Sequence, residues 1–310
     1  MKALTVCVLG GTGFVGSHLC AELARRGHRL RIASRRRERS RKLLVLPGAQ
    51  VIQADVHDVA QLHACVQGCD AVINLVGILN EKGRRGREFH SVHVELVQKL
   101  INACVQCNIT RLLHMSALNA SPDAPSHYLR SKGEAENHVH SAGGKVAVTS
   151  FRPSVIFGPE DDFLNRFASL LEWSPGIFPL PCPHARLAPV YVGDIAGVMA
   201  DTLGNPAACG YRLDLCGPRQ YTLRQLVSYT AAVCGLRRKV LGLPNWMSRL
   251  QAHLLGFAPG KPFTLDNYLS FQVDSICQGA GHCPTTLESV APGYLRKQSD
   301  YDTFRSKHAG

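Results

Sequence analysis

Long apolar runs are missing from this sequence of 310 residues. No run reaches the roughly 18 to 20 apolar residues that a helix needs to cross a bilayer, which argues against a helical membrane protein. We also expect no presequence, because Met1 and Lys2 run straight into an apolar stretch that predicts a strand. We therefore expect a cytoplasmic protein of bacterial type, with a peripheral position at the inner face of the membrane as the alternative.

Cysteine is present but not dense, with 12 residues in the chain. Several cysteines fall in apolar strand or helix patterns, and in a reducing compartment we expect them to be small buried hydrophobic residues: Cys7, Cys20, Cys104, Cys216 and Cys234. Cys104 and Cys107 form a C-x-x-C pair, but no second pair stands nearby. The sequence therefore predicts neither a metal site nor a thioredoxin-type centre, and it leaves the role of this pair open.

Acidic residues are scarcer than basic ones. The chain has 23 Asp and Glu against 35 Lys and Arg, a formal net charge of +12. This balance favours anionic partners such as nucleotide phosphates or an acidic membrane surface. No nucleic-acid motif and no basic patch interleaved with aromatic residues is present, so nucleic acid is not an expected partner. The sequence leaves the oligomeric state open.

A glycine-rich turn follows the first apolar run. It lies between a predicted strand at residues 4–9 and a predicted helix at residues 17–24. At such a turn one glycine permits the tight bend, one lets the backbone approach a pyrophosphate, and one lets helix and strand pack closely. The N–H groups of the helix N-terminus then face the phosphate charge. The spacing predicts a dinucleotide site made by Gly10, Thr12, Gly13, Phe14, Val15 and Gly16.

Strands and helices alternate through the first half of the chain. Apolar runs predict strands at residues 4–9, 29–34, 51–54, 71–77, 111–115 and 146–151. This order indicates βαβ units and a doubly wound parallel sheet of the Rossmann type. From Arg152 onward prolines break the pattern. We expect an α/β cofactor-binding core at residues 1–158, with further strands and helices from 188–235, and a smaller irregular C-terminal lobe at 159–187 and 236–310.

The end of the second predicted strand indicates which dinucleotide binds. Ser34, Arg35 and Arg36 stand there, and no acid follows directly. An NAD site usually places a carboxylate here to bind the ribose 2′-hydroxyl, whereas a guanidinium suits a 2′-phosphate. We therefore expect NADP(H) to be favoured over NAD(H); the alternative is a solvated basic face. After the third strand, Asp55 and Val56 are expected near the adenine, or Asp55 caps the next helix.

A tyrosine and a lysine stand four residues apart on a predicted helix at residues 126–140. Tyr128 and Lys132 therefore share one helix face. An ammonium beside a phenol favours the phenolate and brings the phenol pKa toward neutrality, which suits an acid or base. Ser116 ends a strand 12 residues before Tyr128, where its hydroxyl can orient a carbonyl oxygen. We expect these three residues to be catalytic.

Taken together, these motifs resemble those of the short-chain dehydrogenase/reductases, in the extended or atypical branch of that superfamily. The glycine turn, the residue at position 55, the segment 74–77 and the serine, tyrosine and lysine match in order. The resemblance implies that the cofactor also contacts Leu75, Val76 and Gly77 and, near the nicotinamide, Pro153, Val155 and Ile156.

Residues 128–136, 151–168 and 189–194 are similar to the 39-kDa accessory subunit family of respiratory complex I, whose members are NAD-dependent epimerase/dehydratase-like. The similarity covers residues 4–235 and is to the stand-alone bacterial type. It implies tight NADP(H) binding, a structural or regulatory role in the mitochondrial complex, and a connection of fungal relatives with coenzyme Q metabolism. His93 stands where many relatives carry Asn.

Two functions are compatible with these residues. One is an oxidoreductase that moves hydride between NADP(H) and a carbonyl or alcohol of a small apolar substrate, related to quinones or lipids. The other is a non-catalytic NADPH-binding accessory or assembly protein at a respiratory or quinone-biosynthesis complex or a membrane. A helix at residues 246–257 either faces such a ligand or lipid or, as we expect, simply packs, through Trp246, Met247, Leu250, Leu254, Leu255 and Phe257.

Overall fold

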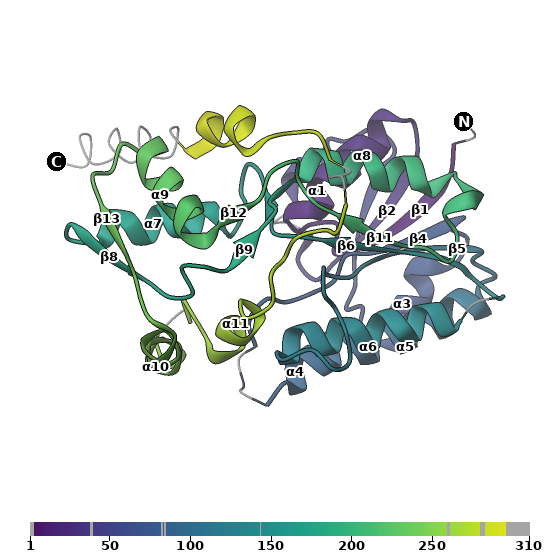
Figure 1. Cartoon of the computed structure of the whole chain (residues 1–310). Helices are drawn as coiled ribbons and strands as arrows, with labels where there is room; N and C mark the ends of the chain where they lie inside the picture. The colour runs from purple at the N-terminus through teal and green to yellow at the C-terminus, as the bar shows by residue number, and fades with distance from the viewer. Residues whose placement is uncertain are drawn as a thin grey trace. The chain divides into compact units, whose positions relative to one another are not determined.

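The computed structural model describes residues 3–37, 40–81, 83, 85–142, 144–258, 261–279 and 283–295. It forms two compact units (Figure 1). Unit 1 comprises Met1–Arg152 and Gly193–Asp214, and unit 2 comprises Pro153–Val192 and Leu215–Gly310. The expected division differs, because it assigned residues 153–158, 188–192 and 215–235 to the first domain. Arg39, part of the basic stretch after the second strand, lies outside the described residues.

Unit 1 contains a seven-stranded parallel sheet in the order β11-β6-β5-β4-β1-β2-β3, which confirms the predicted doubly wound fold. The strands are β1 (Thr5–Leu9), β2 (Arg29–Ser34), β3 (Ala49–Gln53), β4 (Ala71–Asn74), β5 (Arg111–Met115), β6 (Ala147–Pro153) and β11 (Arg212–Leu215). The strand order reverses between β1 and β4, so a ligand crevice is expected at the carboxyl ends of these strands.

Helices cover both faces of this sheet, with α1 and α8 on one face and α3, α5 and α6 on the other (Figure 1). The helical elements are α1 (Phe14–Arg25), α2 (Arg41–Leu44), α3 (Val59–Val66), α4 (Arg87–Phe89), the π-helix η2 (His90–Glu95), α5 (Leu96–Gln106), α6 (His127–Ser141), α8 (Val192–Leu203) and the 3₁₀-helix η3 (Pro206–Ala208). Apolar side chains at helical spacing, such as Leu19 and Leu23 of α1, are fully buried and hold the layers together.

Side chains at the helix starts explain two boundaries. Asp58 caps α3 by accepting a hydrogen bond from the Gln61 N–H at 2.9 Å, and Ser126 caps α6 through the Leu129 N–H at 3.2 Å. Asp55 is therefore not the N-cap. The helical stretch from Arg87 to Gln106 is divided into α4, η2 and α5, because residues His90–Glu95 widen into a π-helix.

Unit 2 is built from short strand pairs and helices. Its strands are β7 (Ile156–Phe157), β8 (Ile177–Leu180), β9 (Arg186–Leu187), β10 (Val190–Tyr191), β12 (Tyr221–Thr222) and β13 (Lys239–Gly242). Its helices are α7 (Leu164–Trp173), α9 (Leu223–Val233), α10 (Asn245–Leu255), α11 (Leu265–Ser270) and a helix at residues 287–295. Residues 215–235 belong to this unit because Leu223, Leu226 and Val227 pack into its core. In the described part of the chain, no helix is both long and apolar enough to span a membrane.

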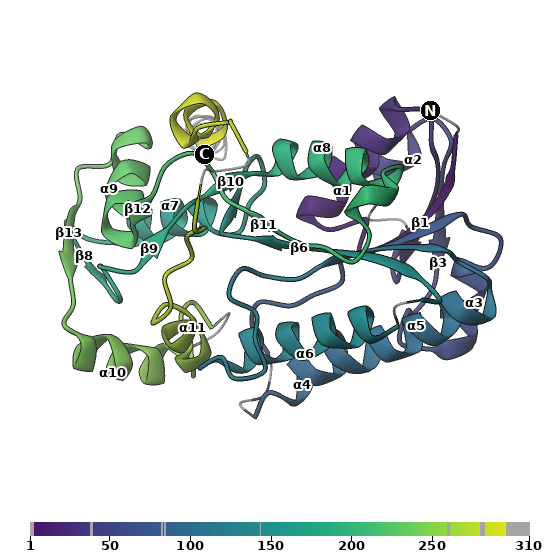
Figure 2. The ribbon, with the colours of Figure 1, turned by 45° about the vertical axis from the view of Figure 1, so that its right-hand side comes forward.

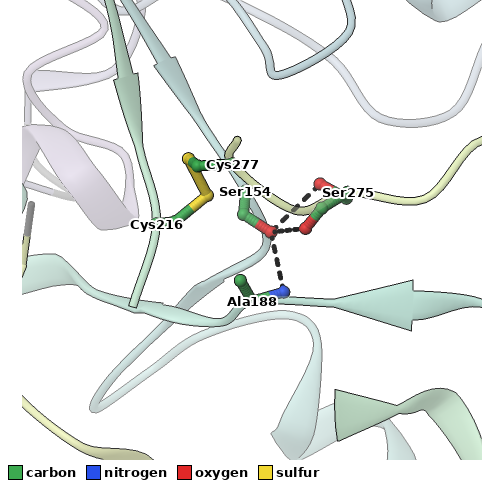
Figure 3. The surroundings of a disulfide bond; sticks show 5 residues. All are labelled: Ser154, Ala188, Cys216, Ser275 and Cys277. Carbon is green, nitrogen blue, oxygen red and sulfur yellow. Dashed lines mark hydrogen bonds between the residues drawn. A yellow bond between two sulfur atoms is a disulfide. The ribbon is translucent and has the colours of Figure 1, made fainter. Parts of the chain in front are cut away.

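A disulfide joins Cys216 to Cys277 within unit 2, 61 residues apart (Figure 3). The expectation that Cys216 is a reduced, buried thiol is therefore wrong, since sequence patterns do not show which distant cysteine lies opposite. Beside the disulfide, the Ser154 hydroxyl donates to the Ser275 carbonyl at 2.7 Å and accepts from the Ala188 N–H at 3.3 Å. The disulfide thus reinforces a hydrogen-bonded junction of three chain segments.

We expect ten reactive thiols when the protein is denatured without reductant and 12 after reduction, because ten cysteines are free and two are paired. By chain entropy the cross-link is worth roughly 4 kcal/mol. Reductant should therefore lower the thermal midpoint of the wild type. The double variant Cys216→Ser, Cys277→Ser should melt at that lower temperature and be insensitive to reductant. Twelve thiols without reduction would contradict the pairing.

Candidate functional site

The glycine turn after β1 is packed too closely for side chains at two positions. Gly10 has a positive φ of 77°, and a Cβ there would lie 2.9 Å from the Leu75 carbonyl carbon. A Cβ at Gly16 would lie 2.3 Å from the Gly10 carbonyl oxygen. The turn therefore needs glycine for its own conformation and for the close approach of α1 and of the loop after β4.

The start of α1 suits an anion. Its N-cap is Gly13, which offers no side-chain acceptor, and the first turn contains no acid. The N–H groups of Phe14, Val15 and Gly16 therefore point from the helix end without a capping side chain. Thr12 and Gly13 are exposed beside them. These features fit the pyrophosphate of a dinucleotide.

The ends of β2 and β3 carry the predicted adenosine contacts. Ser34 is buried and its hydroxyl accepts a hydrogen bond from the Arg36 N–H at 3.3 Å, while Arg35 and Arg36 are exposed. The exposed Asp55 carboxylate accepts from the His57 N–H at 3.0 Å, a local turn, and Val56 packs partly against the core. The structure thus shows local roles for Ser34 and Asp55, and Arg35 and Arg36 are exposed at the surface.

The loop after β4 links the glycine turn to α6. Leu75 donates its N–H to the Leu9 carbonyl at 2.9 Å, and the Val76 N–H binds the Asn74 side chain at 3.1 Å. A Cβ at Gly77 would lie 3.1 Å from Lys132 Nζ. The loop therefore runs from the glycine turn to the lysine that the sequence predicts to be catalytic.

Lys132 lies at the centre of the predicted catalytic group. Its side chain is buried, and Nζ donates to the Met115 carbonyl oxygen at 3.0 Å, directly before Ser116. Burial lowers the pKa of Lys132 to about 8, against the opposing attraction of Glu136. Tyr128 is half-buried on the same helix. The structure therefore brings Lys132, the Ser116 strand end and Gly77 together, with Tyr128 one helical turn away.

A buried ion cluster beside this group was missed by the sequence analysis. Glu136, one turn beyond Lys132, receives hydrogen bonds from Arg152 Nε at 2.9 Å and Arg212 Nε at 2.6 Å. Burial alone would raise the pKa of Glu136, but the hydrogen bonds from Arg152 and Arg212 and the charge of Arg152 outweigh it, so the pKa lies below its ordinary value. The i, i+4 spacing from Lys132 would have placed Glu136 on this face. Its arginine partners, 16 and 76 residues away, carry no local signal.

His93 of η2 connects the loop after β4 to α6. Its Nε2 accepts a hydrogen bond from the Ile78 N–H at 3.1 Å, and its Nδ1 lies 2.8 Å from the Ser131 hydroxyl. That hydroxyl donates to the Tyr128 carbonyl, so it accepts from Nδ1 and the ring is neutral. The His93 and Phe89 rings also contact the Tyr128 ring, each with centroids 5.9 Å away. His93 therefore fixes both the loop and the tyrosine.

The stability of the protein should fall below pH 6.5 because of His93. Burial, with the charge of Lys132, lowers the pKa of His93 to about 2. An unfolded histidine takes up a proton near pH 6.5, so the unfolded state binds more protons and gains stability as the pH falls. At pH 5 the free energy of unfolding is lower by about 2 kcal/mol for this reason.

Denaturant unfolding at pH 7.5 and pH 5 measures this effect. Between pH 7.5 and pH 5, the free energy of unfolding of His93→Asn should fall by about 2 kcal/mol less than that of the wild type. His90→Asn, at an exposed histidine of the same π-helix, should keep the wild-type difference. Equal pH dependence in wild type and His93→Asn would show that His93 is not held neutral.

The predicted nicotinamide segment belongs to unit 2. Pro153 ends β6, the Val155 carbonyl accepts from the Val190 N–H at 2.9 Å, and Ile156 pairs with Val190 in β7 and β10. These contacts hold the segment in an extended conformation within its own unit. No cluster of three or more His, Cys, Asp or Glu suited to a metal occurs among the residues that the structure describes.

The sequence model of the "NAD dependent epimerase/dehydratase family" matches residues 6–173. The chain belongs to this family. The match spans the sheet from β1 to β6, the glycine turn, Ser116, Tyr128 and Lys132. It confirms the predicted resemblance to epimerase/dehydratase-like proteins.

Two relatives and one solved structure are also similar to the chain. The chain is 29% identical to "NADH dehydrogenase [ubiquinone] 1 alpha subcomplex subunit 9, mitochondrial" of Rattus norvegicus over 99% of the chain and 84% of the relative. It is 26% identical to "Ceramide reductase" of Caulobacter vibrioides, covering 77% of the chain and 74% of that protein. The dTDP-glucose 4,6-dehydratase DesIV of Streptomyces venezuelae, solved with NAD bound, has the same fold, with a TM-score of 0.74 at 17% identity over 97% of the chain and 98% of DesIV.

Proposed function

We propose that this epimerase/dehydratase family member binds NADP(H) in preference to NAD(H) and is an oxidoreductase. The observation that carries the proposal is the position of the buried Lys132. Its Nζ donates a hydrogen bond to the carbonyl oxygen of Met115, directly before Ser116, and lies close to Gly77. Gly77 belongs to the loop that packs against the glycine turn. In this proposal the cofactor is held by the glycine turn, by Ser34, Arg35 and Arg36, by Asp55 and Val56, by 75–77, and by Pro153, Val155 and Ile156.

When bound, the nicotinamide would supply or accept the hydride. Tyr128 gives a proton to the substrate carbonyl oxygen during reduction, or takes one from the alcohol during oxidation. Ser116 donates a hydrogen bond to the same oxygen. Lys132 has three N–H donors, of which one binds Met115, so two are left for ribose hydroxyls. Its charge also favours the tyrosinate. His93 holds Tyr128 in place through Ser131.

The substrate we propose is an apolar carbonyl or alcohol related to lipids or quinones. The relative named ceramide reductase supports a lipid, and the relative named as a subunit of NADH dehydrogenase [ubiquinone] supports a quinone. A second candidate is a non-catalytic NADPH-binding accessory protein at a respiratory or quinone-biosynthesis complex. The 29% identity to a complex I subunit over nearly the whole chain favours this candidate. For either function we propose a position in the cytoplasm or peripherally at the membrane.

Titration of the purified protein with NADPH and NADH tests the cofactor assignment. We expect Arg35→Asp to weaken NADPH binding at least about tenfold, because a charge-assisted hydrogen bond to the 2′-phosphate is replaced by repulsion. NADH binding should be unchanged or stronger. Arg41→Asp, with the same charge change in α2, is the control and should bind both as the wild type does. Unchanged NADPH affinity in Arg35→Asp would refute the assignment of the 2′-phosphate site.

A further inference from the structure

Helix α10 of unit 2 buries its small side chains and exposes its large apolar ones. Its buried residues are Ser248 and Ala252. The Ser248 hydroxyl accepts a hydrogen bond from the Cys182 N–H at 3.2 Å and seats the helix at the end of the β8–β13 pair. A core-facing helix normally has the reverse arrangement. The expectation that its large apolar residues pack inside the lobe is therefore wrong for most of them, since only Leu255 is half-buried and the others are exposed.

The outward side of α10 is a continuous apolar face. Trp246 is 68% exposed, Leu250 51% and Leu254 64%, and Met247 is exposed beside them. At 3.6 residues per turn these four side chains fall within about 100° of the helix circumference. We call them the α10 face. Such a contiguous exposed face marks a surface that contacts an apolar partner.

Basic residues stand before, on and after α10 in the sequence. Residues 237–261 contain Arg237, Arg238, Lys239, Arg249 and Lys261 and no aspartate or glutamate. Arg249 lies on α10 itself, next to the face and exposed, and Lys239 is exposed on β13. The segment that carries the α10 face is therefore positively charged and complements negative charge, in a chain whose formal net charge is +12.

A short helix with a tryptophan and leucines on one side and basic residues around it is typical of helices that lie in the membrane interface. The apolar side chains enter the acyl boundary while the basic groups remain among anionic headgroups. The helix lies at one end of unit 2 beside α11, with the Tyr268 hydroxyl bound to the Asn245 side chain at 2.8 Å (Figure 2). We propose that the α10 face docks unit 2 on a membrane surface that contains anionic lipid. This inference holds whether or not the protein catalyses a reaction.

The chain's two tryptophans permit a direct test. In Trp173→Phe the remaining tryptophan lies on the α10 face, and in Trp246→Phe the remaining one is at the end of α7, 87% exposed. With vesicles of phosphatidylcholine and phosphatidylglycerol, we expect a blue shift and quenching by brominated acyl chains in Trp173→Phe. Trp246→Phe should show neither effect. Pure phosphatidylcholine vesicles should bind more weakly, because the basic surroundings contribute nothing there.

Leu250→Glu and Leu254→Glu should weaken sedimentation with anionic vesicles roughly tenfold or more. Val45→Glu makes the same kind of change at an exposed residue of unit 1 and should sediment like the wild type. Circular dichroism should show all three variants folded. No vesicle binding by the wild type, or undiminished binding by Leu250→Glu, would overturn the proposal. A dimer in light scattering that Leu250→Glu dissociates, without vesicle binding, would assign the face to a second copy instead.

Discussion

Dinucleotide binding is expected to be lost in Gly16→Ala. The added Cβ would lie 2.3 Å from the Gly10 carbonyl oxygen and 2.6 Å from Gly11 Cα, both of them backbone atoms that no rotamer change can move. The start of α1 must then shift away from the turn, and the N–H groups that face the pyrophosphate move with it. We expect the affinity for NADPH to fall at least about a hundredfold, which is close to 3 kcal/mol. The free energy of unfolding should fall by about 1 to 3 kcal/mol.

Gly197→Ala is the matched control, since a Cβ at that position of α8 meets no atom within 4 Å. That variant should bind NADPH normally and be stabilised by up to about 1 kcal/mol, because alanine favours a helix. Calorimetric titration and denaturant unfolding separate the two effects. Tight NADPH binding by a folded Gly16→Ala protein would show that the turn is not the cofactor site.

Turnover is expected to fall about 10²- to 10⁴-fold in Tyr128→Phe, because the reacting oxygen of the substrate loses its proton donor. The ring contacts with Phe89 and His93 do not need the hydroxyl, so the ring stays in position. NADPH affinity should therefore stay within about twofold of the wild type, because the phosphate and ribose contacts are untouched. The assay is NADPH oxidation with quinone, lipid or steroid-like carbonyl compounds.

Tyr211→Phe, at an exposed tyrosine of unit 1, controls for the loss of a hydroxyl and should be as active as the wild type. Equal turnover in wild type and Tyr128→Phe would refute the catalytic role. If no carbonyl compound is reduced while NADPH binds tightly, the accessory function is the one to retain.

The parts of the fold that depend on local sequence patterns were predictable from the sequence. The segments 29–34 and 111–115 coincide with β2 and β5, because both have apolar residues at their buried positions, Leu30 and Ile32 in β2 and Leu112 and Leu113 in β5. The glycine turn was predictable because steric crowding at Gly10 and Gly16 excludes other residues. Tyr128 and Lys132 were predictable as neighbours because a helix brings positions i and i+4 together.

Contacts between distant segments were not predictable. The partners of Glu136 come from β6 and β11, and Cys216 meets Cys277 across 61 residues. The π-helix at His90–Glu95, which lets His93 reach both Ile78 and Ser131, departs from the 3.6-residue period that sequence patterns reveal. The α10 face was interpreted wrongly for a related reason, since periodicity shows that a helix is amphipathic but not which side is buried.

Native mass spectrometry on the purified protein, before and after addition of excess NADPH and NADH in competition, tests the central claim most directly. The account predicts one dinucleotide per chain, with the mass of NADP(H) whether carried from the cells or taken up from the mixture. It also predicts that Gly16→Ala carries none and that Tyr128→Phe carries as much as the wild type. A wild-type protein that stays free of dinucleotide in excess NADPH, or that takes NADH in preference, would contradict it.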